Sequence, residues 1–271
     1  MGLKSPLACP TSTTHQAIGD SPIIVPALPA TPPCQHSASA ARADHRRARL
    51  EARIRRQYQT VCQIYDFGSL TVPLTRVAEP DEMLERMELN VAGGGAVAPR
   101  WQPYWAELWG CSLVVGRWLV RQDLRDIPVL DLGCGLGLTG TVAAACGARV
   151  TMVDAAPPAL LFARLNSWPY RDRVHVRRLD WCRDRLPDPF PLIVGADILY
   201  DRGDWPHLEA FWRAHLAPGG IVLLGEGGRS TGGEFPDWLH GRGWQLDRSE
   251  TSLPGHPRPI RLFQLRSAGH P

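Results

Sequence analysis

Val129-Leu130-Asp131-Leu132-Gly133-Cys134-Gly135-Leu136-Gly137 is the stretch that decides the fold of this 271-residue chain. An apolar run with one acid leads into three glycines at alternate positions, and the largely apolar residues 138–146 follow. This order predicts a strand, a tight loop and a helix. Because glycine has no Cβ, the loop can take positive φ angles and let a ligand approach the backbone, beside the free N–H groups of the helix N-terminus. The stretch predicts a loop that binds a nucleotide-type cofactor, with an ordinary tight turn as the alternative.

A second predicted strand, residues 149–154, ends in Asp154, at the ~20-residue spacing where a carboxylate accepts hydrogen bonds from ribose hydroxyls. Two classes of cofactor suit this arrangement. Gly135-x-Gly137-x-x-Gly140 satisfies the dinucleotide fingerprint, so an NAD(P)-dependent oxidoreductase is one alternative. Asp131, near the end of the first strand, would repel a pyrophosphate and attract a cofactor that carries an amino group and a sulfonium. The residues therefore favour S-adenosylmethionine (SAM).

The composition limits the class of protein. With 44% apolar residues the chain can bury a large core, and a net charge of +3 is too small to indicate a nucleic-acid partner. No apolar run reaches the ~18 residues of a membrane span, and the start lacks the pattern of a secretory signal. The cysteines show no metal-ligand spacing, which predicts free thiols, no metal site and a cytoplasmic location. They are Cys9, Cys34, Cys62, Cys111, Cys134, Cys146 and Cys182.

Residues 1–57 form a Pro-rich and then Arg-rich segment. They offer little apolar surface to offset the entropy of ordering, so we expect disorder. Within the segment, the arginine-dense residues 42–56 are predicted to be a solvated helix that leads into the domain. A mitochondrial presequence is the alternative, because few acids precede Gln57.

Residues 58–100 are predicted to be an accessory to the glycine-loop domain. Residues 61–77 alternate in the manner of a hairpin with the two-residue turn Gly68-Ser69. Pro73 would place its strand at a sheet edge. A short helix is expected over residues 80–89.

Residues 103–119 place apolar side chains at helical spacing, which predicts an amphipathic helix packed on the sheet. Three tryptophans in this stretch exceed what the packing of one helix needs. Trp105 and Trp109 are predicted to wall the cofactor pocket, since an indole suits both an adenine face and a sulfonium cation.

Strand and helix patterns alternate through the remainder and end in two strands joined by a Pro-rich connection. This predicts an α/β fold over residues 101–267: a Rossmann-like, doubly wound sheet of seven strands with a terminal antiparallel hairpin. The further strands are expected at 174–179, within 192–200 with its end at Asp197, and at 221–226, 244–249 and 260–265, and the helices at 157–167, 205–216 and 234–241.

Two pairs of residues follow strands on the carboxyl side of this sheet, where ligands bind in open α/β folds. Asp180 and Trp181 can hydrogen-bond an adenine amino group and cover its ring. Asp197 and Tyr200 form an Asp-x-x-Tyr pair suited to an acceptor site, with a helix cap as the alternative role of Asp197.

The motifs of residues 103–109, 129–137 and 195–200, with Asp154 and Asp180-Trp181, resemble those of the class I, seven-strand SAM-dependent methyltransferases. Within these the sequence resembles methyltransferase family 16, the protein-lysine methyltransferase group that includes the enzymes of the electron-transfer-flavoprotein β-subunit. Residues 226–229 are similar to a Gly-Asp-Pro-Gly-Arg segment of those enzymes, and the chain departs from many relatives at Gly110-Cys111. The resemblance implies that Asp197 and Tyr200 line the acceptor site, and that SAM contacts come from Trp109, Gly133, Cys134, Gly135, Asp154, Trp181 and Ala196. The residue patterns add Asp131, Gly137 and Asp180 to the cofactor site.

The leading hypothesis is methyl transfer from SAM to an amine, with a protein lysine as the acceptor. A small-molecule N-methyltransferase with a nicotinamide-like acceptor, the NAD(P) enzyme and an inactive scaffold are the alternatives. We expect a monomer whose partner is a protein substrate or a small amine, and neither nucleic acid nor a membrane.

Overall fold

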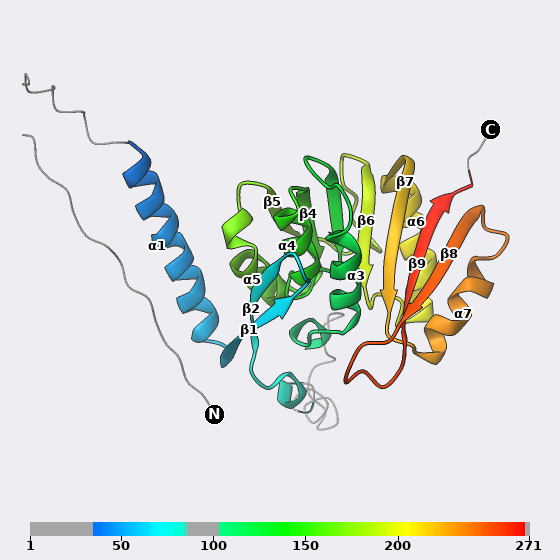
Figure 1. The fold of residues 1–271 in the computed structure, drawn as a ribbon, viewed down its shortest axis with the longest axis horizontal. Coiled ribbons are helices and arrows are strands. Elements are labelled where there is room, and N and C mark those ends of the chain that lie inside the picture. Colours follow the sequence, from blue (N-terminus) through cyan, green and yellow to red (C-terminus); the bar gives the residue numbers. More distant parts are fainter. Residues whose placement is uncertain (1–34, 84, 86–102, 269–271) are drawn as a thin grey trace, which may run out of the picture. The chain divides into compact units, whose positions relative to one another are not determined.

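The computed structural model describes residues 35–83, 85 and 103–268, with side chains from residue 41 (Figure 1). The chain divides into an N-terminal unit, 1–41, and a second unit from residue 42 onwards. Helix α1 begins in the first unit, and the other elements below belong to the second. The predictions for residues 1–34 and for residues 86–89 of the expected short helix lie outside the described residues. No helix of the described ranges is long and apolar enough to cross a membrane.

Helix α1 (Gln35–Arg55) lies in the segment that was expected to be disordered. Its sequence is rich in Ala and Arg, which have high helix propensity, and Arg47 pairs with Glu51 at 3.1 Å one turn away. Helix formation therefore corrects the expectation of disorder for these residues. The solvated helix expected within 42–56 is present, and most of its side chains are exposed.

The accessory hairpin is present as predicted. Strands β1 (Thr60–Asp66) and β2 (Thr71–Val77) pair antiparallel in a sheet of their own. The N–H of Phe67 donates to the carbonyl of Leu70 at 2.9 Å, which closes the turn at Gly68-Ser69. The described residues between 80 and 85 are helical, in agreement with the helix expected there.

The main sheet has seven strands in the order β5-β4-β3-β6-β7-β9-β8. Strands β3 to β7 run parallel, and β9 is antiparallel to both of its neighbours, so the predicted doubly wound sheet with a terminal hairpin is confirmed. The strands are β3 (Pro128–Leu132), β4 (Arg149–Asp154), β5 (Val174–Arg178), β6 (Phe190–Ala196), β7 (Leu216–Glu226), β8 (Trp244–Thr251) and β9 (Ile260–Ser267). The helices are α3 (Cys111–Leu119), α4 (Leu138–Ala145), α5 (Pro157–Asn166), α6 (Trp205–His215) and α7 (Ser230–Leu239), with short 3-10 turns η1 (Pro103–Ala106), η2 (Trp168–Tyr170) and η3 (Arg202–Asp204).

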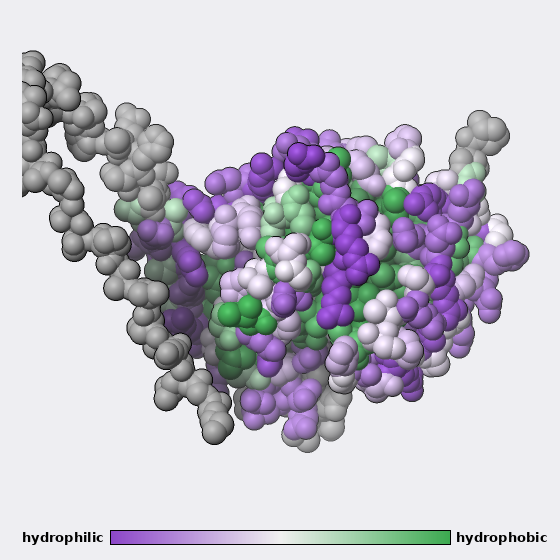
Figure 2. All heavy atoms as spheres, in the orientation of Figure 1, coloured by the Kyte–Doolittle hydropathy of each residue, from purple (hydrophilic) through white to green (hydrophobic). Residues whose placement is uncertain are grey.

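Helices cover both faces of this sheet (Figure 1). Successive side chains of a strand point to opposite faces: Val129 joins the core under α3, α4 and α5, and Leu130 and Leu132 join the core under α6 and α7. Strand β3 is thus buried on both sides, as parallel strands usually are. On the face drawn in Figure 2, hydrophilic and hydrophobic residues are mixed, while the largest fully buried side chains, such as Phe162, Trp205 and Trp212, lie in these two cores.

Several element boundaries differ from the sequence prediction. Strand β7 begins at Leu216 and not at 221, helix α7 begins at Ser230 and not at 234, and two further differences affect the region of the cavity. Residues 103–119 form two pieces, η1 and α3, because the chain leaves the helix between residues 107 and 110, and this separates Trp105 from Trp109. Strand β6 begins at Phe190 and stops at Ala196, one residue before the expected end at Asp197, because Asp197 takes a left-handed backbone conformation with φ +60° that cannot continue a strand.

Candidate active site

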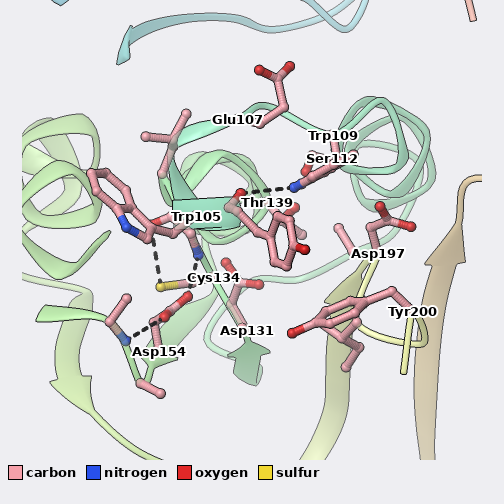
Figure 3. A pocket seen from close by; sticks show the side chains of 18 of the residues that line it. Trp105, Glu107, Trp109, Ser112, Asp131, Cys134, Thr139, Asp154, Asp197 and Tyr200 are labelled. Carbon is pink, nitrogen blue, oxygen red and sulfur yellow. Dashed lines mark hydrogen bonds between the residues drawn. The ribbon is translucent and has the colours of Figure 1, made fainter. Parts of the chain in front are cut away.

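A cavity of about 730 Å³ opens at the carboxyl ends of the parallel strands (Figure 3). This volume is typical of sites for small molecules, and ligands in open α/β sheets bind at this edge. All of the predicted site residues except Gly137 line the cavity. They are Trp109, Asp131, Gly133, Cys134, Gly135, Asp154, Asp180, Trp181, Ala196, Asp197 and Tyr200.

Gly137 is part of the same loop but serves its packing. It has φ +80° and precedes the first residue of α4. A Cβ at this position would lie 2.8 Å from the Cα of Ala163 in α5. Only glycine therefore lets the loop and the first turn of α4 approach α5 this closely.

Asp154 fastens the glycine loop. Its two carboxylate oxygens accept hydrogen bonds from the N–H of Gly135, at 2.9 Å, and from the N–H of Ala156 at the start of α5, at 2.8 Å. Each carboxylate oxygen has a second lone pair, so ribose hydroxyls can still bind to it. Burial raises the pKa of Asp154, and the backbone N–H groups oppose that rise.

Asp131 is a carboxylate buried at the floor of the cavity, with 1% of its surface exposed. The N–H of Gly140 in α4 donates to it at 2.8 Å, and no ion pair to it is present among the described residues. Burial raises the pKa of Asp131 to about 7, and the nearby charge of Asp154 acts in the same direction. A ligand that carries a cation would satisfy this carboxylate, whereas a pyrophosphate would be repelled. The donor set therefore fits a cationic cofactor.

Aromatic side chains wall the cavity from several elements. Trp105 is buried among Phe162 and Tyr58, with ring centroids 5.6 Å away in both cases. The indole N–H of Trp109 donates to the carbonyl of Tyr104 at 3.0 Å, which fixes that ring at the side of the cavity (Figure 3). Trp181 is half-buried after β5, where the sequence predicted a cover for an adenine ring.

Asp197 follows β6 and is buried. Its N–H donates to the carbonyl of Gly225 at 2.8 Å, and its carboxylate accepts the N–H of Gly227 at 3.4 Å and pairs with the guanidinium of Arg229. The helix-cap alternative is not what the structure has, because Asp201 caps η3 through the N–H of Gly203. Asp197 instead connects β6 to the loop after β7.

Tyr200 lies at the mouth of the cavity with 41% of its surface exposed, and its ring contacts that of Tyr104 at 5.8 Å between centroids. Partial burial and, next, the charge of Asp204 raise the pKa of Tyr200 to about 12. Its hydroxyl therefore keeps its proton throughout the physiological range.

The cavity also has lining residues that the sequence did not single out. Tyr104 lay inside the recognised tryptophan-rich motif, and Thr139 followed the glycine loop, so their positions could have been found from the sequence. Thr231 comes from the first turn of α7, which was expected to begin only at residue 234. The unpredicted residues include Tyr104, Glu107, Leu108, Ser112, Thr139, Asp201, Arg202, Asp204 and Thr231.

The strand order and this cavity define the class I methyltransferase fold. The N-methyltransferase NodS of Bradyrhizobium japonicum, solved with S-adenosyl-L-homocysteine, matches with a TM-score of 0.52 and 18% identity over 69% of this chain and 99% of that one. The glycopeptide N-methyltransferase MtfA, solved with SAM, matches with a TM-score of 0.51 and 18% identity over 68% of this chain and 98% of that one. These similarities establish the fold.

Within this class, residues 104–231 match the family described as lysine methyltransferase. Protein N-lysine methyltransferase METTL21A of Xenopus tropicalis is 36% identical over 44% of this chain and 58% of its own length. EEF1A lysine methyltransferase 3 of Mus musculus is 32% identical over 44% of this chain and 54% of its own length. Histone-arginine methyltransferase METTL23 of Xenopus laevis is 33% identical over 38% of this chain and 47% of its own length. The chain thus spans about half the length of the curated relatives it matches. The resemblance to class I methyltransferases and to the lysine methyltransferase family is confirmed.

Proposed function

We propose that this protein transfers a methyl group from SAM to the side-chain amine of a protein lysine. The observation that carries the proposal is the buried carboxylate of Asp131 beside the glycine loop, which has no ion-pair partner among the described residues, in a domain that matches lysine methyltransferases. The names of the relatives support a protein acceptor, and the neighbours solved with SAM or S-adenosyl-L-homocysteine support the cofactor.

SAM, when bound, supplies a methyl group on a cationic sulfonium, which a nucleophile displaces in line. In our proposal, Asp131 holds the amino group of the cofactor and Asp154 accepts hydrogen bonds from the ribose. Asp180 and Trp181 hold the adenine, and Trp109 contacts SAM from the wall of the cavity. Gly133 and Gly135 let the backbone approach the ligand, since both have positive φ angles.

The acceptor has to arrive as a neutral amine. A lysine with its ordinary pKa near 10.4 is protonated at pH 7, and the neutral form then costs roughly 4.6 kcal/mol. Aromatic walls such as Tyr104 and Trp109 disfavour the charged form by desolvation. We propose that Asp197 and Tyr200 orient the amine, and that fixing the nucleophile in line supplies much of the rate enhancement.

The test is to offer SAM with a labelled methyl group, together with the purified protein, to a cell extract. We expect the label in protein, and mass spectrometry to place it on lysine. Label in the low-mass fraction would instead support the small-molecule N-methyltransferase. Calorimetry with SAM and with NAD(P) separates the oxidoreductase, which would bind the dinucleotide and not SAM.

We also propose that residues 101–267 form the catalytic domain of a cytoplasmic monomer, with residues 58–100 as its accessory and 1–57 as an N-terminal segment. Support for a reducing compartment comes from the five described cysteines, none of which forms a disulfide within the described ranges. Gel filtration with light scattering tests the oligomeric state.

A further inference from the structure

The guanidinium of Arg229 lies between an acid and an aromatic ring at the edge of the cavity. It pairs with the carboxylate of Asp197, and its central carbon is 4.9 Å from the ring centroid of Trp109. Both partners line the cavity. A carboxylate next to an indole face is the combination that recognises organic cations. The guanidinium of Arg229 thus fills the position between Asp197 and Trp109 where an organic cation from outside could otherwise bind.

Hydrogen bonds to Glu226 fix the backbone around Arg229. The buried carboxylate of Glu226 accepts the N–H of Gly228 at 3.0 Å and the N–H of Arg229 at 2.7 Å. Arg261 donates to the same carboxylate at 2.9 Å. Glu226 thus ties the turn at Gly228 and Arg229 to Arg261 of β9, and this fixes the backbone that carries the guanidinium of Arg229.

We propose that Arg229 is a specificity-determining residue of the acceptor site. Its guanidinium fills the cation position between Asp197 and Trp109, so that the acceptor enters this part of the site as a neutral amine. The inference rests on the proposed methyl transfer to an amine and adds the charge state that the site selects.

The charge balance around Asp197 supports this assignment. Asp197 alone would attract an ammonium group and favour its protonated, unreactive form. Cys111 of α3 also faces it, but burial raises the pKa of that thiol and keeps it neutral. Glu226 of β7 is paired with Arg261, and the ring of His256 lies near Gly227 with its Nδ1 2.7 Å from the carbonyl of Arg258. Among the residues with described side chains, Arg229 is the cation bonded to Asp197.

A binding experiment tests the inference without turnover. n-Butylammonium, the cation of a lysine side chain, is titrated into the protein saturated with S-adenosylhomocysteine, and binding is followed by calorimetry or tryptophan fluorescence. Arg229→Met should bind it at least about tenfold more tightly than the wild type, equivalent to about 1.4 kcal/mol. Arg229→Lys, which keeps a cation at the position, should bind it as the wild type does. Adding Asp197→Asn to Arg229→Met should remove the gain.

Arg266→Met is the matched control, because Arg266 forms a surface ion pair with Asp247 on the terminal hairpin. It should leave butylammonium binding unchanged. Unchanged affinity for S-adenosylhomocysteine shows that each variant is folded, and Arg229→Gln replaces Arg229→Met if the latter loses that affinity. Equal butylammonium binding by the wild type and the neutral variant would overturn the inference, whatever the protein methylates.

Kinetics provide the second arm, in an assay with a methylated lysine acceptor. Arg229→Met should lower KM for the acceptor and lower kcat near neutral pH, and should move the acidic limb of the kcat profile up by about one pH unit, a tenfold change. An active wild type whose Arg229→Met variant keeps the same pH profile contradicts the inference and leaves the methyltransferase proposal intact. A wild type that methylates no amine contradicts the proposed function, while the butylammonium titration still decides the inference.

Discussion

The side-chain amide of Asn166 pairs with the backbone of Thr75 through two hydrogen bonds. The Thr75 N–H donates to Asn166 Oδ1 at 2.8 Å, and Asn166 Nδ2 donates to the Thr75 carbonyl at 2.9 Å. The same Nδ2 donates to the carbonyl of Leu136 in the glycine loop at 2.9 Å. One buried amide at the end of α5 therefore connects strand β2 of the accessory hairpin with the loop of the candidate cofactor site.

Asn166→Asp is expected to uncouple these parts. A carboxylate cannot donate, so it would face the carbonyls of Thr75 and Leu136 without hydrogen bonds in a buried place. We expect the free energy of unfolding to fall by about 3 kcal/mol and cofactor affinity to fall with it, measured by urea denaturation and calorimetry. The control is Gln245→Glu on exposed β8, which makes the same chemical change and should cost less than about 0.5 kcal/mol. Equal costs for the two variants would show that the Asn166 bonds are not stabilising.

Gly137→Ala should destabilise the protein by more than its backbone conformation alone requires. A left-handed alanine costs about 1–2 kcal/mol, and its Cβ would also meet Ala163 of α5 at 2.8 Å. Gly219→Ala is the matched control, since Gly219 has φ +71° and no atom within 4 Å of the added Cβ. In urea denaturation, the free energy of unfolding should therefore fall by about 1–3 kcal/mol more in Gly137→Ala than in Gly219→Ala. Cofactor affinity should be lost only in Gly137→Ala.

Asp131 should make the ligand-free protein less stable as the pH rises. Its pKa in the folded state is about 7, above the unfolded value of about 3.9. Between these values the unfolded chain ionises and the folded protein does not, so stability falls from about pH 4 to about pH 7 and is level above. Asp131→Asn keeps an acceptor for the N–H of Gly140 and removes this dependence. Urea denaturation gives the free energy of unfolding of both proteins at about pH 4 and about pH 8. Between these two pH values the wild type should lose on the order of 4 kcal/mol more than Asp131→Asn, so the variant should be the more stable protein at about pH 8.

Cofactor binding should depend on Asp131 in the opposite direction. The ionised carboxylate attracts the amino group of the ligand, so affinity for SAM should rise as the pH passes from about 6 to about 8. Calorimetry on Asp131→Asn should show weak binding with a flat profile over the same range. A wild-type affinity that is independent of pH would contradict the assignment of Asp131 to a cationic group.

The fold could be predicted from the sequence because local pattern and tertiary structure agree in it. The apolar run of β3, the glycines that follow and the acid at the end of β4 favour a strand, a tight loop and a second strand. The alternation of strand and helix patterns after them predicts the sheet. The site was predicted where side chains lie at the carboxyl ends of strands, as with Asp154, the last residue of β4, and Asp197, which directly follows β6. The pairing of Asp197 with Arg229 was not predicted. The two residues meet because Asp197 has a left-handed backbone conformation and Arg229 lies in the turn after β7, and neither feature produces a periodic pattern in the sequence.

Asp197 and Tyr200 should affect turnover and not cofactor affinity. Asp197→Asn keeps the size of the side chain and a residue that tolerates φ +60°, whereas Asp197→Ala adds backbone strain. We expect Asp197→Asn and Tyr200→Phe each to lower kcat by about 100-fold, with Kd for SAM within about twofold of the wild type. Because the pKa of Tyr200 is raised to about 12, its hydroxyl acts as a hydrogen-bonding group and not as a base. The loss in Tyr200→Phe should therefore be the same factor at about pH 7 and about pH 9, and a loss that grows with pH would indicate that Tyr200 removes a proton from the acceptor.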